Sequence, residues 1–105
     1  PGYDVRSDHT SEDGQRTEVR FIEVKGRIAG ADTVTVSRNE ILTSLNEPDK
    51  WMLALVKVLP GEGEEIRYLW RPFEAHRSGV DFAVTSVNFD WNKLWVAGDE
   101  GRGIA

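Results

Sequence analysis

The chain contains no cysteine among its 105 residues, which excludes a disulfide framework and any metal site built on thiolates. It has no apolar run near the roughly 18 residues that a membrane-spanning helix needs, and no signal-peptide pattern. Neither a glycine-rich phosphate loop nor a G-x-S-x-G elbow is present. His9 and His76 have no further ligand at a metal-binding spacing, so we predict no zinc site. These absences favour a cytoplasmic protein that has no membrane partner.

Basic residues are also scarce, since 13 Lys and Arg stand against 18 Asp and Glu and give a formal charge of −5. This charge argues against binding nucleic acid through bulk electrostatics, because phosphate contacts need clustered cations. It leaves open an acidic metal site, and a partner domain could supply a basic surface. The length predicts one domain, residues 1–98, followed by a flexible Gly-rich tail, residues 99–105.

Residues 3–27 have the pattern of one β-hairpin. A two-residue turn at Asp13-Gly14, a strong hairpin signal, sets Asp4 opposite Glu23. Directly opposed residues share a face, with Cβ atoms about 4.5–5.5 Å apart, and strand alternation adds Lys25 to that face. We expect this polar face to point away from the core. The opposite face is apolar and carries Tyr3, Val5, Ile22 and Val24.

The rest of the chain predicts further strands and two helices. Residues 51–59 are nearly continuously apolar, which is typical of a strand buried on both faces at the centre of a sheet. The order of elements indicates an α/β (α+β) fold with a mixed sheet and few helices. Other extended segments are predicted at 33–37, 65–71 and 82–89, and helices at 38–46 and 91–97.

The two helices have clear start signals. Ser37 and Glu40 form a capping box, in which each side chain satisfies a backbone N–H at the helix start. Asp90 is an N-cap for the second helix, which Gly98 ends. The buried stripe of the first helix is predicted to be Ile41, Leu42 and Leu45.

An Asp on one strand followed by Glu-x-Lys on the next, here Asp4, Glu23 and Lys25, is the spacing of PD-(D/E)xK nucleases. The surrounding sequence segments resemble the NO VEIN C-terminal family. This is a domain-of-unknown-function family regarded as restriction-endonuclease-like and often appended to helicase or restriction proteins. The resemblance covers nearly the whole chain. The segments that carry it are Gly2 to Val5, residues 21–26 (FIEVKG), residues 33–40 (TVTVSRNE), residues 71–73 (RPF) and residues 82–91 (FAVTSVNFDW).

The resemblance implies a restriction-endonuclease-like sheet and hydrolysis of DNA phosphodiesters with Mg²⁺ or Mn²⁺. Asp4, Glu23 and the backbone carbonyl of Val24 would hold the metal, and Lys25 would orient the attacking water or stabilise negative charge. Glu40 could face this site as a further acid, but its capping role already explains it, and we prefer that role. Such nucleases usually have a helix before the first strand, so we expect truncation at the N-terminal helix.

Ordinary structural roles compete with each of these assignments. Glu and Lys alternating on a strand are usually a solvated face. Arg6, Arg27 and Arg38 could contact DNA phosphates or be plain surface cations. The four Trp residues could stack on bases, but we expect them to be buried anchors. Two functions therefore stay open: a metal-dependent nuclease within a helicase or restriction protein, and a non-catalytic module that binds DNA or holds another domain.

Overall fold

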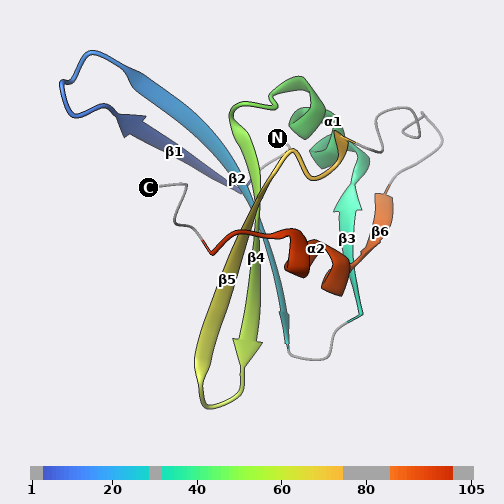
Figure 1. The fold of residues 1–105 in the computed structure, drawn as a ribbon. Helices are drawn as coiled ribbons and strands as arrows, with labels where there is room; N and C mark the ends of the chain where they lie inside the picture. The colour runs from blue at the N-terminus through green and yellow to red at the C-terminus, as the bar shows by residue number, and fades with distance from the viewer. Residues whose placement is uncertain (1–3, 29–31, 75–85, 101–105) are drawn as a thin grey trace.

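The computed structural model describes residues 4–28, 32–74 and 86–100. Within them the chain forms six strands in two sheets and two helices, so the α+β class predicted from the sequence is confirmed (Figure 1). The elements in chain order are β1 (Val5–Thr10), β2 (Thr17–Ile28), β3 (Thr33–Ser37), α1 (Arg38–Asn46), β4 (Trp51–Leu59), β5 (Gly63–Trp70), β6 (Ser86–Asp90) and α2 (Trp91–Ala97).

The larger sheet has the strand order β1-β2-β4-β5, in which β2 and β4 run parallel and the other pairs run antiparallel. β3 and β6 form a separate antiparallel pair. Figure 1 shows β3, β6 and both helices beside one face of the larger sheet, while the turn end of the β1–β2 hairpin projects away from them. We call the face toward this second layer the inner face and the opposite face the outer face.

The hairpin has the predicted register but a wider turn. Every β1–β2 pair, from Val5 with Ile22 to Thr10 with Thr17, falls where the Asp13-Gly14 turn places it. The prediction of a two-residue turn is wrong, because the strands separate beyond the bond from the Ser11 N–H to the Arg16 carbonyl, 2.7 Å. The register survives because the longer loop has the same centre, with Gly14 at a φ of +70°.

β4 is one of the two interior strands of the larger sheet and has the predicted bounds. Trp51, Leu53 and Leu55 point to the inner face and enter the core, whereas Met52 and Ala54 point to the outer face. All five side chains are buried. Burial on both faces explains the continuous apolar sequence of this strand.

The core lies between the two layers and is rich in aromatic rings. Phe73 is fully buried, with its ring 5.7 Å from that of Trp51 and 4.9 Å from that of Phe89. Trp91 and Trp95, one turn apart on α2, stack with ring centroids 5.8 Å apart. Three of the four Trp residues are therefore buried anchors, as predicted.

The outer face of the larger sheet is apolar and partly exposed. The register aligns Val5, Ile22, Met52 and Trp70 in one row across all four strands. Trp70 is 38% exposed, so the prediction of a buried anchor is wrong for this residue, because β5 turns it to the face without a second layer. The same face carries the exposed Val24, Val58 and Ile66. Tyr3, predicted for this face, lies outside the described residues.

The buried face of α1 and the start of β6 differ from the prediction. In α1 Ile41 and Leu45 are buried, but Leu42 is exposed and Ser44 is buried in its place. β6 begins at Ser86, and the first part of the segment predicted at 82–89 lies outside the described residues.

The segment after α2, expected to open a flexible tail, begins on β5. Asp99 exchanges two backbone hydrogen bonds with Tyr68, of 2.7 and 2.8 Å, and Glu100 pairs with Arg67 at 3.2 Å. Residues 101–105 of that tail lie outside the described residues.

Candidate functional site

Glu23 is buried on the inner face of β2. Its neighbour in the parallel strand β4 is Leu53, a core residue, and only 4% of Glu23 is exposed. The expectation that this face points away from the core is therefore wrong. Strand alternation identifies which residues share a face, but the face that becomes covered is decided by where β3 and α1 pack.

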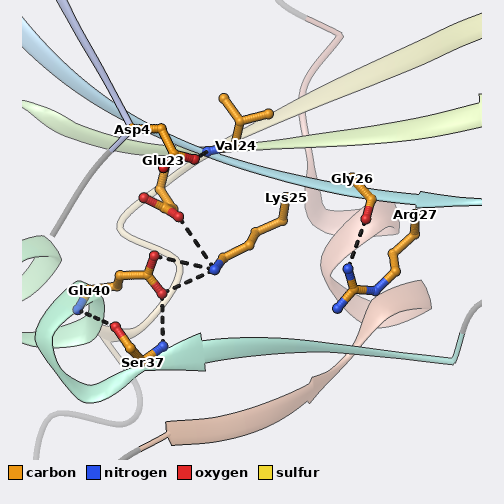
Figure 2. A network of polar contacts seen from close by, with 8 residues as sticks. All are labelled: Asp4, Glu23, Val24, Lys25, Gly26, Arg27, Ser37 and Glu40. Atoms are coloured by element: carbon orange, nitrogen blue, oxygen red, sulfur yellow. Dashed lines mark hydrogen bonds and ion pairs between the residues drawn. The ribbon is translucent and has the colours of Figure 1, made fainter.

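Lys25 lies between two carboxylates on this face (Figure 2). Its Nζ is 3.1 and 3.2 Å from the two carboxylate oxygens of Glu40 and 3.4 Å from Oε1 of Glu23. The Lys25 and Glu40 side chains are themselves largely buried. A solvated strand face, the ordinary interpretation of a Glu-x-Lys pattern, therefore does not describe these residues.

Glu40 is both a helix-capping residue and an acid of the site, the two roles that the sequence alone left as alternatives. It completes the predicted capping box, because its Oε1 accepts the Ser37 N–H at 2.8 Å and Ser37 Oγ accepts the Glu40 N–H at 3.1 Å. The same carboxylate binds Lys25 (Figure 2). The preference for capping alone was incomplete, because local sequence does not reveal that the start of α1 packs against β2.

The pKa values of the two glutamates are shifted in opposite directions. Burial raises the pKa of Glu23 to about 8, and a hydrogen bond to Glu40 and repulsion from its charge add to this shift, while Lys25 opposes it. Burial alone would raise the pKa of Glu40, but hydrogen bonds from Glu23, the Ser37 backbone and Lys25 outweigh it and lower the value to about 2. At neutral pH Glu23 is thus protonated and Glu40 is ionised.

Asp4 lies directly before the edge strand β1 and contacts β2 beside the site. Its Oδ2 accepts the Val24 N–H at 3.0 Å, and its own N–H donates to the Ile22 carbonyl at 3.0 Å. Its charge contributes to the raised pKa of Glu23, so the two predicted carboxylates are electrostatic neighbours. The N–H and C=O of a strand residue point to the same side, so the Val24 carbonyl also faces the β1 side.

The acids do not form a compact metal cage. Among residues 4–28, 32–74 and 86–100, no group of three His, Asp or Glu side chains converges closely enough to hold a metal ion. Asp4 and Glu23 with the Val24 carbonyl remain the predicted ligand set, in which a backbone oxygen takes the third place.

The three predicted arginines are spread around the site. Arg6 is exposed on β1 and pairs with Asp8 at 3.3 Å. Arg27 donates to the Thr33 carbonyl at 3.1 Å, which ties the end of β2 to the start of β3. Arg38 is the first residue of α1. Contact of any of them with DNA phosphates stays a prediction.

Ser37→Ala should lower the free energy of unfolding by about 1 kcal/mol, because the cap of α1 is lost. Urea denaturation of the variant measures this change. Ser86→Ala is the matched control, since Ser86 pairs with Ser37 across the β3–β6 ladder and caps no helix. Equal stability of Ser37→Ala and the parent would show that the capping box contributes nothing.

The fold and these side chains define a small α+β domain with a buried Glu–Lys–Glu cluster beside an aspartate that precedes the edge strand β1. A family model described as "Protein NO VEIN, C-terminal" matches residues 1–69, and the chain belongs to this family. The match includes every residue of the site. No curated protein and no solved structure matches the chain. No helix in the described part of the chain is long and apolar enough to cross a membrane.

Proposed function

We propose that the domain is a Mg²⁺-dependent nuclease of the PD-(D/E)xK class, which hydrolyses DNA phosphodiesters as part of a larger cytoplasmic protein with helicase or restriction domains. The observation that supports it best is the burial of Glu23 beside Lys25, with Asp4 bonded to the N–H of the next residue, Val24.

Stability alone does not account for this cluster. Removing a carboxyl group from water costs free energy, and an apolar side chain of similar volume is often equally stable or more so. Here two carboxyl groups share the interior with one lysine, and one of them has a pKa raised to about 8. Ionisable groups in such surroundings are concentrated at functional sites.

The residues present fit a Mg²⁺ ion. This ion takes hard oxygen ligands, commonly one or two carboxylates together with water and substrate phosphate. Asp4, just before β1, and Glu23 on β2 would supply carboxylates, and the Val24 carbonyl faces the β1 side, as does the Val24 N–H that Asp4 accepts. When bound there, Mg²⁺ would polarise the phosphate and lower the pKa of a bound water.

Lys25 supplies the positive charge that the reaction needs. Its ammonium is held at a fixed place by Glu40 and Glu23, so it is oriented before substrate arrives. In this position it stabilises negative charge on the scissile phosphate or orients the attacking water. Glu40 acts as a positioning residue, because it contacts Lys25 and fixes the start of α1.

Conversion of supercoiled plasmid to nicked or linear DNA, with Mg²⁺, Mn²⁺ or EDTA, tests the proposal. Activity should require the divalent ion. Absence of cleavage both by this chain and by a longer protein that includes its natural flanking domains would contradict it.

Lys25→Met should lower the cleavage rate by about 100-fold, because a positioned charge at the phosphate is lost while the aliphatic stem is kept. Mn²⁺ affinity should change little, since Lys25 is not a ligand. Lys50→Met, in the exposed loop before β4, is the matched control and should cleave like the parent. Parental activity of Lys25→Met would remove Lys25 from the reaction.

The apolar outer face favours a second candidate, a non-catalytic module that keeps this fold to hold another domain or to bind DNA. Val5, Ile66 and Trp70 are all more than a third exposed on that face, and contiguous exposed apolar surface is characteristic of assembly sites. This candidate predicts no metal binding at Glu23 and no cleavage even in the longer protein.

A further inference from the structure

β2 is longer than its neighbour β4, and its first residues have one open edge. The first β2–β4 pair is Phe21 with Trp51, whereas β2 begins at Thr17. Residues 17–19 therefore pair with β1 on one side and with no described strand on the other. Figure 1 shows this part of the hairpin extending past the beginning of β4.

The backbone groups at this edge point away from β1. The Ser11 N–H bonds the Arg16 carbonyl, so alternate residues of β2 counted from Arg16 face β1. The Phe21 N–H faces the other way and donates to the Lys50 carbonyl at 2.8 Å. Thr17 and Val19 have the same parity as Phe21, and within the described residues their N–H and C=O groups have no hydrogen-bond partner on that side.

These groups open into a groove of about 360 Å³ between the edge of β2 and the Trp70 ring, with Asp49 and Lys50 at its end. A second hollow, of about 330 Å³, shares Asp49 and Trp70 with it. The groove lies where a backward extension of β4 beside β2 would run, which is the place that a further extended chain would take. Trp70 forms its apolar wall.

Arg71 fixes the end of the groove. Its backbone has a φ of +53°, which is unusual for a residue with a side chain. Its Nε donates to the Pro48 carbonyl at 3.4 Å, and its guanidinium contacts the Asp49 carboxylate. The loop before β4 is thus attached to the end of β5, which fixes this end of the groove.

We propose that this groove binds an extended peptide by β-strand addition, with main-chain hydrogen bonds to Thr17 and Val19 and an apolar peptide side chain against Trp70. Unpaired strand edges bind other chains through main-chain hydrogen bonds, whereas a nucleic acid offers no ladder of N–H and C=O groups. The charges of the groove also favour a peptide over a polyanion, because Glu18 and Asp49 balance Arg20 and Lys50.

This peptide site goes beyond the nuclease proposal and needs no metal. Trp70 is on the outer face, opposite the face that carries Glu23 and Lys25. Experiments in EDTA therefore test it separately, and failure of the metal site would leave their result unchanged.

A phage-displayed random heptapeptide library panned against the protein in EDTA provides the probe, and enriched peptides are synthesised for calorimetry. Val19→Pro removes the N–H that faces the groove without removing a donor to β1, a position where a strand accepts proline. Asp8→Pro is its matched control, because Asp8 pairs with Val19 and its N–H faces the opposite edge of the hairpin. Trp70→Ala removes the apolar wall, and Val96→Ala, on the exposed face of α2, is its control.

Binding should weaken at least 10-fold in Val19→Pro and in Trp70→Ala, and it should be unchanged in both controls. Chemical-shift changes should include the Thr17 and Val19 amides and the Trp70 indole. If Val19→Pro fails to fold, Trp70→Ala and the shift changes decide. No enriched peptide that binds the parent, or binding that both groove variants retain, would overturn the proposal.

Discussion

Replacing Glu23 by glutamine should abolish Mn²⁺ binding and cleavage. The amide keeps the volume of the side chain but cannot carry the negative charge that a divalent ion requires of its ligand. Calorimetric titration with Mn²⁺, which usually binds such oxygen sites more tightly than Mg²⁺, measures the loss.

Glutamine is the informative substitution because Glu23 is buried. Alanine would leave a cavity beside the core as well as remove the ligand, so lost binding would have two explanations. Below pH 4.5 Glu23 is protonated in both the folded and the unfolded state, so a neutral amide should leave the free energy of unfolding nearly unchanged there. At higher pH the amide should raise the free energy of unfolding, because only the parent releases a proton when it unfolds. Glu18→Gln, at an exposed position of the same strand, is the matched control. Parental Mn²⁺ affinity in Glu23→Gln would show that this residue is not a metal ligand.

The free energy of unfolding should decrease as the pH rises from about 5 to 8. Glu23 has a pKa of about 8 in the folded protein against 4.5 in the unfolded chain, so in this window the folded state holds a proton that the unfolded state has lost. Linkage then gives a slope approaching about −1.4 kcal/mol per pH unit for one such proton.

Glu40 has the opposite effect at lower pH. Its pKa is about 2 when folded against 4.5 when unfolded, so its stabilisation is present above pH 4.5 and is lost as the pH falls toward 2. Together the two glutamates should place maximum stability near pH 5. Urea denaturation across the pH range measures the profile, and Glu23→Gln should remove the decline above pH 5. An equally steep decline in that variant would assign the effect to other groups.

Features that depend on local sequence could be predicted closely. The hairpin register follows from a turn centred on Asp13-Gly14, and both helix starts follow from side chains that bond to nearby backbone. β4 was recognisable because burial on both faces leaves a continuous apolar run. Each of these signals acts over a few residues, so no tertiary information was needed.

The environment of the site could not be predicted in this way. Glu23 and Lys25 were placed on one face, but the covered face depends on the chain between β2 and β4. Connections between parallel strands are nearly always right-handed, which would select the face once the strand order is known. That order is a long-range property, and Glu40 was therefore placed at a helix cap but not against Lys25.

Because Glu40 has two roles, a substitution at position 40 affects two parts of the structure. One carboxylate both starts a helix and holds the lysine of the candidate site, so alanine there would remove a fold element and a site element together. Glutamine can still accept the Ser37 N–H and keep the capping box, but it cannot form the ion pair. A mutational screen that samples only alanine at this position would therefore classify it as structural and conceal its link to Lys25.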